Sequence, residues 1–510
     1  MNSTRPPTSP APSPPRPVRY AALDPSADQI REMGADAVEW MARYYDSLQS
    51  PGDVPVYPRT TSAQLKLLVD ERLPQDGLAV SQLLARFREV IVPGSRHNGH
   101  PRFFGYVSAP GTAVAAIADL LASVLNANVT AWRSAPAATE IEHLAIDWIR
   151  EALGCDAGAG GLFLSGGSMA NLTALAAARH RHCGEAIAAA GARALPAPLR
   201  VYISAEGHHS TDKAASLLGI GYANVRHVAV DDRFRMDVED LNRKIAEDRA
   251  AGMEPFFVVA SAGTVVTGAV DPLRAIAEVA RRERLWMHVD ACYGGFARLA
   301  PSVRSLFDGL EEADSIALDP HKWLYLPADV GCLIYRDPAA LRSAFALGAD
   351  YTRVMAETPE EAFAFWDYGP ELSRRFRALK VWMVLAHAGA RQIGDAIEAN
   401  LDCARHLAEL VDASDDLELM APVELSIFCF RYLPPESRSA RPRPAAEEDA
   451  IDRLNERILL AIQHGGSSYL SNASIRGRFA LRGCVLNYRT TRRDMEILLD
   501  DVRRAAEEAS

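Results

Sequence analysis

The chain has 510 residues, which at roughly 100–200 residues per domain predicts about two to four domains. Hydrophobic residues make up 48% and charged residues 24%, the balance of a globular protein that buries a core. The 55 basic and 66 acidic residues give a net charge of −11. This sign disfavours nucleic acid as a partner, because binding a phosphate backbone requires a basic surface.

The cysteines and the N-terminal residues indicate the cellular compartment. The seven cysteines are scattered and form no CxxC pair, which is typical of a reducing compartment and argues against a disulfide framework or a structural zinc site. No stretch has the roughly 18 consecutive apolar residues of a membrane-spanning helix. The first 17 residues contain seven prolines and no apolar signal segment. We therefore predict a cytoplasmic protein without a membrane partner and with a disordered tail over residues 1–20.

Helical periodicity dominates the first part of the chain after this tail. Apolar residues recur at helical spacing over residues 28–48, and further helices are predicted over 62–71 and 79–92. Residues 21–112 are therefore assigned to an N-terminal helical segment.

From residue 113 onward, short apolar runs alternate with segments of helical period. The predicted strands are 161–164, 200–204, 256–260, 286–289 and 330–335. Strands that alternate with helices form a mainly parallel sheet covered on both faces, so the predicted fold class is α/β.

The last part of the chain has the pattern of a smaller α+β domain. Its predicted elements are helices over 373–389 and 394–411 and strands over 419–431 and 479–487. Two polar stretches, 351–366 and 434–448, are by composition surface connections.

A glycine turn follows the first predicted strand, in Leu164-Ser-Gly-Gly-Ser-Met-Ala-Asn171. Backbone N–H groups at the start of the next helix, with the hydroxyl of Ser168, make a binding site for an anion. The pattern is neither GxGxxG nor a P-loop, so taken alone a tight turn and a phosphate site are equally compatible with it.

Two further motifs follow later strands of the same sheet. Asp290, in His288-Val-Asp-Ala-Cys-Tyr293, ends a buried run, where a carboxylate needs a partner because a buried unpaired charge is costly. Lys322, in Leu318-Asp-Pro-His-Lys-Trp-Leu324, has apolar neighbours that disfavour its charged form, which predicts a lowered pKa. For each residue the ordinary alternative is structural: a backbone-bonded aspartate and a solvated surface lysine.

A pair of histidines in Glu206-Gly-His-His-Ser-Thr211 follows another predicted strand. These side chains offer a flat ring, a metal ligand or only a polar loop. Combined, the four motifs place an anion site, an aromatic ring, a carboxylate and a lysine after separate strands of one sheet. Those are the groups that bind pyridoxal 5′-phosphate, a phosphate-bearing aldehyde with a basic ring nitrogen.

The string Asp-Pro-His-Lys-Trp at 319–323, together with His-Val-Asp-Ala at 288–291, resembles the pyridoxal-phosphate-dependent group II amino-acid decarboxylases, in particular their aromatic-L-amino-acid decarboxylase-like branch. The similarity runs from about residue 28 to the end of the chain. It implies a type I aminotransferase-like fold with a large cofactor domain over 113–379, a small C-terminal domain over 380–510, and an N-terminal segment over 21–112 that wraps a partner. It also implies a homodimer with active sites at the subunit interface.

Position by position, the resemblance implies that Lys322 bonds covalently to the cofactor aldehyde and that Asp290 pairs with the ring nitrogen and keeps it protonated. Of the two adjacent histidines, His209 is matched to the ring-stacking position. The other cofactor contacts that the resemblance implies are Gly167, Ser168, Thr264, His321 and, from across the dimer, Ser373.

Tyr351 matches a tyrosine that, in the family, lies on a mobile loop and assists protonation of the substrate α-carbon. The resemblance therefore implies a catalytic loop where composition alone predicted a surface connection. Phenylalanine at this position is associated with relatives that form an aldehyde by oxidative deamination. The tyrosine favours decarboxylation of an L-amino acid to its primary amine, and aldehyde formation is the alternative.

The substrate pocket is where the chain departs from the aromatic branch. The matching wall positions carry smaller or more polar residues, although the tyrosine is kept. The predicted pocket residues are Asn98, Tyr106, Val107, Ser108, Asn128 and Thr130. Lost apolar contact weakens binding of an aromatic side chain by roughly 25 cal/mol per Å², and buried Asn98 and Asn128 require hydrogen bonds. We therefore predict a more polar pocket than that of a dopa or tryptophan decarboxylase.

A remote alternative is a metal-dependent hydrolase. Its ligands would be drawn from His208, His209, His288, Asp290 and His321. The chain has no HExxH or similar helical spacing, and this alternative leaves Lys322 without a role, so no metal is predicted.

Overall fold

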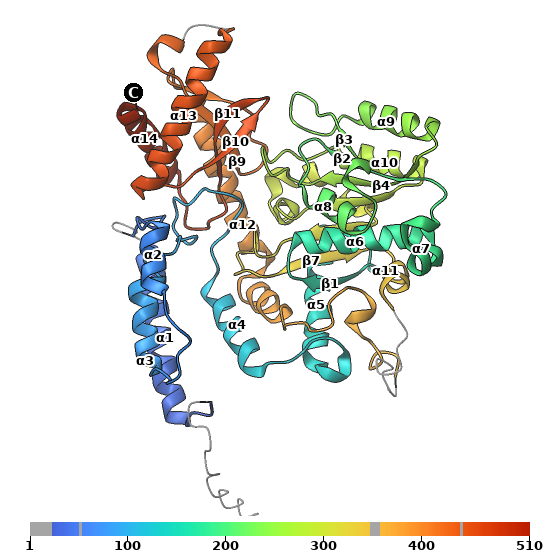
Figure 1. Cartoon of the computed structure of the whole chain (residues 1–510), viewed down its shortest axis with the longest axis horizontal. Coiled ribbons are helices and arrows are strands. Elements are labelled where there is room, and N and C mark those ends of the chain that lie inside the picture. The colour runs from blue at the N-terminus through green and yellow to red at the C-terminus, as the bar shows by residue number, and fades with distance from the viewer. Residues whose placement is uncertain (1–22, 50–53, 347–357, 439–441, 510) are drawn as a thin grey trace, which may run out of the picture. The chain divides into compact units, whose positions relative to one another are not determined.

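The computed structural model describes residues 23–49, 54–346, 358–438 and 442–509 (Figure 1). Contacts divide these residues into two compact units. Residues 23–49 and 58–95 form the first unit, and residues 54–57 together with those from 96 onward form the second.

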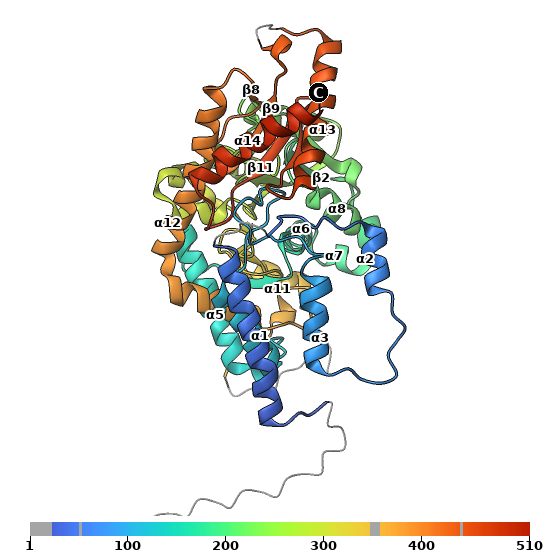
Figure 2. The same cartoon turned by 90° about the vertical axis from the view of Figure 1, so that its left-hand side faces the viewer.

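The first unit is helical, as predicted. Its helices are α1 (Ala27–Ser47), α2 (Ser62–Val69) and α3 (Val80–Arg86), which continues as a π-helical turn over Phe87–Ile91. Ser26 and Thr61 cap α1 and α2 through capping boxes. Helix α1 packs beside α3 (Figure 2). The ring of Trp40 meets the ring of Phe87 edge-on, with the ring centres 4.8 Å apart.

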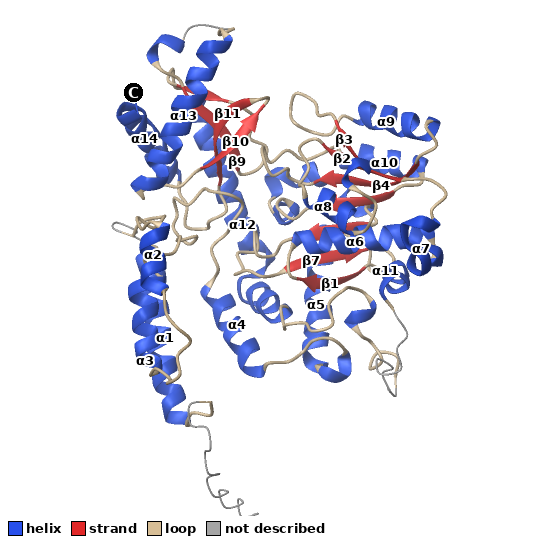
Figure 3. Cartoon of the chain, in the orientation of Figure 1, coloured by secondary structure: helices blue, strands red, loops and turns tan. Residues whose placement is uncertain are grey.

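The second unit is built around a seven-stranded sheet of order β1-β7-β6-β5-β4-β2-β3, which confirms the α/β prediction (Figure 3). Strand β7 is antiparallel to both neighbours and the other pairs are parallel, so β1 and β2 to β6 all run in one direction. The strands are β1 (Gly160–Leu164), β2 (Leu199–Ser204), β3 (Val225–Val228), β4 (Glu254–Ser261), β5 (Trp286–Asp290), β6 (Ser315–Leu318) and β7 (Gly331–Tyr335). This order places the ends of the four strands that precede the predicted motifs, β1, β2, β5 and β6, along one edge.

Helices cover this sheet, and its strands are buried as parallel strands require. The long helix that follows β1 crosses the sheet and contacts β1, β4, β5, β6 and β7. The helices of this region are α4 (Ala113–Leu125), α5 (Pro136–Leu153), α6 (Gly167–Cys183), α7 (Glu185–Ala190), α8 (Ser210–Leu217), α9 (Val238–Ala250), α10 (Leu273–Glu283) and α11 (Pro338–Phe345). Helix α6 is the one that begins at the predicted anion site.

The C-terminal part forms a separate antiparallel sheet of order β10-β11-β9-β8, packed against helices, as predicted for a smaller α+β domain (Figure 3). Its elements are α12 (Ala378–Asp412), β8 (Leu417–Leu419), β9 (Ile427–Tyr432), α13 (Ala445–Gly465), β10 (Ser471–Ile475), β11 (Arg478–Cys484) and α14 (Arg492–Ala509). Gly389, at φ 73°, interrupts α12 where the sequence predicts a break between two helices. The single strand predicted over 419–431 is wrong, because β8 and β9 are two strands paired antiparallel.

Side chains of the C-terminal part, among them Arg482 and Ser426, bond to the loops of the large sheet. Arg482 of β11 donates to the carbonyl oxygens of Val265, Val266 and Tyr106 and is almost fully buried. Tyr293, just after β5, shares a 2.8 Å hydrogen bond with Ser426. The loops that follow β4 and β5 are therefore fixed by residues far along the chain.

One ion pair lies entirely inside the second unit. The guanidinium of Arg374 pairs with Glu142 of α5, and their side chains are 1% and 0% exposed. Arg374 also donates to the carbonyl oxygens of Val129 and Phe163, and its guanidinium lies 4.0 Å from the centre of the Phe365 ring. The pair joins α5 and β1 to the segment that leads into α12.

We expect Arg374→Met to lower the free energy of unfolding by about 3 to 5 kcal/mol, because it leaves the buried carboxylate of Glu142 without a counter-charge. The measurement is urea unfolding of the apoprotein followed by circular dichroism. Arg181→Ala is the control, since its pair with Asp337 is exposed and is worth about 1 kcal/mol or less. Equal effects of the two substitutions would contradict the role given to the buried pair.

Candidate active site

A cavity of about 390 Å³ opens at the carboxyl ends of β1, β2, β4, β5 and β6. These strands point the same way, so the residues that follow them meet at one edge of the sheet. The lining comprises the glycine turn with Ser168, His208, Thr264, Asp290, His321 and Lys322, among others. Groups from four separate sequence motifs are therefore gathered in one place.

Lys322 is held by a carboxylate that the sequence analysis did not assign to the site. Its Nζ lies 2.9 Å from Oδ2 of Asp319, whose Oδ1 accepts from the backbone N–H of Gly167 at 2.7 Å. Asp319 thus joins the lysine loop to the start of α6. The signal was present in the sequence, because Asp319 lies three residues before Lys322 in the recognised motif.

The predicted lowering of the Lys322 pKa is wrong. Burial by itself lowers the pKa of this amine, but the negative charges of Asp319 and Asp290 outweigh burial and the pKa is raised. The prediction considered the apolar neighbours in sequence and missed the carboxylates that the fold brings to the amine.

Asp290 is a half-buried carboxylate held by hydrogen-bond donors. Its Oδ2 accepts from Nδ2 of Asn171 at 2.8 Å, and its Oδ1 accepts from the N–H of Cys292 at 3.2 Å. Burial alone raises the pKa of Asp290, but these hydrogen bonds and the nearby positive charge of Lys322 outweigh it, and the pKa is lowered. Asp290 is therefore a carboxylate at neutral pH.

The histidine that reaches the cavity is His208, whereas His209 was expected there. The ring of His209 is 86% exposed and lies 3.4 Å from Asp212. His208 lies two residues before α8 begins at Ser210, and its Nδ1 accepts from the N–H of Ser210 at 3.1 Å. Burial lowers the pKa of His208, so its ring is neutral at pH 7. The turn into α8 points adjacent side chains in different directions, which sequence alone does not resolve.

The glycine turn has the backbone geometry of an anion site. Helix α6 begins at Gly167, where an added Cβ meets Sγ of Cys292 at 2.3 Å and Oδ2 of Asp319 at 3.0 Å. Only glycine fits this close approach. Ser168 follows in the first turn of α6, and it lines the cavity together with Gly166 and Gly167 at the helix N-terminus.

Two other predicted contacts also line the cavity. The hydroxyl of Thr264 accepts from the N–H of Ala269 at 3.1 Å, which fixes the loop after β4. His321 donates from Nδ1 to the carbonyl oxygen of Val330 at 2.7 Å. Its Nε2 is then the ring nitrogen that remains for a second hydrogen bond.

The predicted substrate-pocket residues do not line this cavity. They are Asn98, Tyr106, Val107, Ser108, Asn128 and Thr130. The amide oxygens of Asn98 and Asn128 already accept hydrogen bonds, from Nε of Arg96 and from the N–H of Arg374. Asn98 is half-buried and Asn128 is exposed, so the expectation that both amides are buried is wrong.

Two other predicted site residues remain, Ser373 and Tyr351. Ser373 is exposed and does not line the cavity of this chain. Tyr351 lies outside the described residues.

The side chains of the metal-hydrolase alternative are not gathered around one point. His209 points away from the cavity, and both ring nitrogens of His288 are engaged with Asn171 and Ser315. Over residues 23–49, 54–346, 358–438 and 442–509, no group of three or more His, Cys, Asp or Glu side chains is arranged to hold a metal ion.

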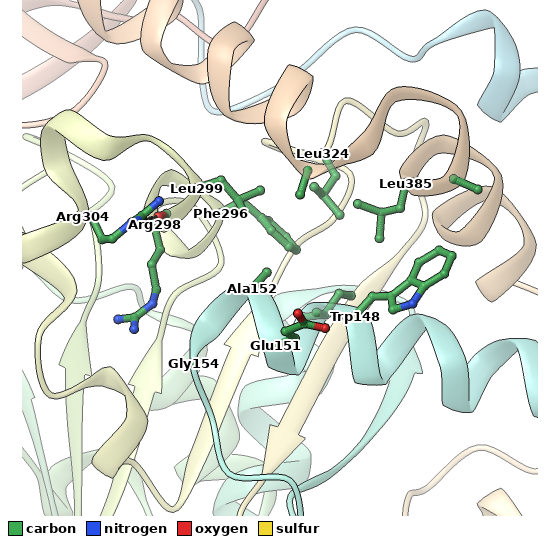
Figure 4. Close-up of a pocket in the computed structure, with 13 residues that line it drawn as sticks. Trp148, Glu151, Ala152, Gly154, Phe296, Arg298, Leu299, Arg304, Leu324 and Leu385 are labelled. Atoms are coloured by element: carbon green, nitrogen blue, oxygen red, sulfur yellow. Dashed lines mark hydrogen bonds between the residues drawn. The ribbon is translucent and has the colours of Figure 1, made fainter.

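A second and larger cavity, about 620 Å³, lies among α5, α12 and the segment after β5. Figure 4 shows Trp148 of α5 and Leu385 of α12 beside it, with Arg298 and Arg304 at the other end. Lys322 and Asp290 do not line it. The smaller cavity is therefore the candidate active site, because the charged groups meet there.

The residues of the smaller cavity fit pyridoxal phosphate. Lys322 matches the aldehyde, the carboxylate of Asp290 matches the ring nitrogen, and the N-terminus of α6 at Gly167 matches the phosphate, with a neutral ring from His208 beside them. No helix within the described ranges is long and apolar enough to cross a membrane.

Comparison with known proteins agrees with this fit. The family model of the pyridoxal-dependent decarboxylase conserved domain matches residues 62–433. An aromatic-L-amino-acid decarboxylase of Bacillus atrophaeus is 34% identical, with 96% of this chain and 98% of that protein aligned. A phenylacetaldehyde synthase of a Rosa hybrid cultivar is 32% identical, with 91% of each aligned.

Among solved structures, the Oryza sativa TDC with PLP and tryptamine is similar at 30% identity and a TM-score of 0.87, covering 95% of this chain and 99% of that one. The similarity therefore extends over both the seven-stranded sheet and the four-stranded C-terminal sheet. The chain belongs to the pyridoxal-dependent decarboxylase family and is a pyridoxal-phosphate-dependent amino-acid decarboxylase.

Proposed function

We propose that this enzyme converts an aromatic L-amino acid to its primary amine, with Lys322 as the residue that bonds to the cofactor aldehyde and Asp290 as the partner of its ring nitrogen. One observation carries this assignment: Lys322 and Asp290 follow adjacent strands, β6 and β5, and line a single cavity beside the N-terminus of α6. His208 takes the ring-contact role that the sequence analysis gave to His209.

The chemistry that pyridoxal phosphate supplies when bound is an electron sink for the charge left behind when the carboxylate departs. Asp290 holds a proton on the ring nitrogen, because a carboxylate with a lowered pKa pairs with a cationic partner. Asp319 orients the amine of Lys322 toward the cavity. Tyr351 delivers the proton that the α-carbon takes up after decarboxylation, which gives an amine instead of an aldehyde.

Two observations support an aromatic substrate. The relatives that align over about 90% of this chain include proteins named for aromatic amino acids, tyrosine and tryptophan. The amides of Asn98 and Asn128, which favoured a polar substrate, bond within the chain.

A panel of aromatic, acidic, basic and short L-amino acids, assayed with added pyridoxal phosphate, tests the substrate class. We expect carbon dioxide and amine in equal amounts from tyrosine, dopa or tryptophan. Lys322→Ala is expected to lower kcat by at least about a thousandfold, because it removes the covalent attachment point.

Lys213→Ala is the matched control for this panel, since Lys213 is an exposed lysine of α8. Turnover of only short or polar amino acids would refute the assignment of an aromatic substrate and would support the prediction of a more polar pocket. Full activity of Lys322→Ala would refute the assigned role of Lys322.

The reaction outcome is tested by Tyr351→Phe. Removing the phenol removes the proposed proton donor, so the ratio of aldehyde to amine is expected to rise at least tenfold, with matching oxygen consumption. Products are measured by chromatography. Tyr222→Phe, at an exposed tyrosine, is the control, and an unchanged ratio in Tyr351→Phe would remove Tyr351 from the mechanism.

We also propose that the enzyme is a cytoplasmic homodimer with active sites at the subunit interface. Helix α4 supports this, because it exposes apolar side chains at helical spacing along one face: Ile117, Leu120, Leu121, Val124 and Leu125. A contiguous apolar stripe of this kind marks a protein interface. The exposed Ser373 is then available to a neighbouring site, and the seven free cysteines suit a reducing compartment.

The α4 interface is tested by Val124→Glu, which places a charge on a side chain that is 76% exposed in one chain. We expect the wild type to elute as a dimer and the variant to shift to a monomer with loss of activity, because burying an unpaired carboxylate is costly. The measurement is size-exclusion chromatography with light scattering. Leu217→Glu, equally exposed on α8, is the control, and a dimeric Val124→Glu protein would rule out this face.

A further inference from the structure

A chain of hydrogen bonds runs along β5, from Trp286 at the start of the strand to the carboxylate of Asp290 at its end. Nε1 of Trp286 lies 2.8 Å from Oγ of Ser315, which lies 2.8 Å from Nδ1 of His288. Nε2 of His288 lies 2.9 Å from Oδ1 of Asn171, whose Nδ2 lies 2.8 Å from Oδ2 of Asp290. Four side chains thus connect in series to one oxygen of the carboxylate.

The two ends of this chain determine the direction of every bond in it. An indole N–H can only donate and a carboxylate can only accept. Trp286 therefore donates to Ser315, and Asn171 turns its amide N–H to Asp290. The amide oxygen of Asn171 must then accept from Nε2 of His288, which leaves Nδ1 to accept from the hydroxyl of Ser315.

This direction requires a neutral imidazole, and burial provides it. His288 is buried among the strands, with the ring of Phe257 stacked at 5.7 Å, and desolvation lowers the pKa of His288 to about 4. The negative charge of Asp290 acts in the opposite direction and raises the pKa of His288, but burial outweighs it. A neutral ring donates from one nitrogen and accepts at the other, as the chain requires.

Asn171 is the branch point. Its second amide proton goes to Oγ of Ser210, at the start of α8, at 2.8 Å. All the hydrogen-bonding capacity of Asn171 that faces the sheet is therefore used, and its amide cannot turn over without breaking three bonds. A head-to-tail series of donors also polarises each bond in turn, which strengthens the last one, to Asp290.

We propose that Trp286, Ser315, His288 and Asn171 form a directed relay of positioning residues that orients Asp290 and holds it ionised toward the cofactor's ring nitrogen. This inference rests on the proposed role of Asp290. These four neutral side chains stabilise the charge of the Asp290 carboxylate, as a buried cation does in other proteins. Trp286, Ser315 and His288 do not line the cavity. The relay therefore acts on the cofactor only through Asn171 and Asp290.

The test uses holoenzyme reconstituted with pyridoxal phosphate that carries nitrogen-15 at the ring. Its NMR signal reports protonation of that nitrogen directly, without activity. In the wild type we expect the protonated position. Ser315→Ala and His288→Leu are expected to move the signal toward neutral pyridine and to raise the dissociation constant of pyridoxal phosphate about tenfold, since a bond to a charged group is weakened.

Two further variants separate the relay from general damage. His288→Gln keeps an amide donor for Asn171 and is expected to return the signal most of the way to wild type. Thr173→Ala is the matched control, because Thr173 is buried on the same helix as Asn171 and bonds only to the carbonyl of Met169. Its signal is expected to equal that of the wild type. Ser315→Ala is the smallest change, so it carries the test if His288→Leu does not fold.

The outcomes distinguish this inference from the proposed function. A signal that shifts in Asp290→Asn but stays at the wild-type position in Ser315→Ala and His288→Leu would overturn the relay and leave the role of Asp290 standing. A neutral ring nitrogen in the wild type would overturn both. Equal shifts in Thr173→Ala and Ser315→Ala would also overturn the relay, because they would reflect general loosening of the core.

Discussion

The carboxylate of Asp319 connects the two halves of the active site. One oxygen binds the amine of Lys322 and the other binds the N–H of Gly167, which is 152 residues earlier in the chain. Because both bonds come from one rigid group, the lysine loop after β6 and the helix start after β1 have a fixed separation. The phosphate end and the aldehyde end of the cofactor must match that separation.

Much of the fold follows from local pattern, and the exceptions have physical causes. Strands β1, β2, β4, β5 and β7 are mainly apolar, and each lies within two residues of its predicted position. Strand β3, with the sequence Val-Arg-His-Val, was missed because its edge position leaves two polar side chains partly exposed. Strand β8 has three residues, too few for a pattern of alternation to be visible.

The site was predictable as a set of motifs but less so as a geometry. Lys322, Asp290, Thr264 and the glycine turn lie together, because each follows a strand whose direction the α/β pattern determines. The choice between His208 and His209 depends on how one turn enters α8, and the partners of Asn98 and Asn128 come from loops. The role of Asp319 required knowing which amine it meets in space.

The hydrogen bonds of Arg482 determine when, during synthesis of the chain, the cofactor pocket takes its final form. The carbonyl oxygens of Val265, Val266 and Tyr106 are held by a residue that is synthesised more than 200 positions after the first two. On the ribosome, the large sheet emerges before β11 exists, and until then the carbonyl oxygens of Val265 and Val266 lack the guanidinium of Arg482 as a partner. The cofactor pocket therefore takes its final form late in translation, after the C-terminal sheet has emerged and docked.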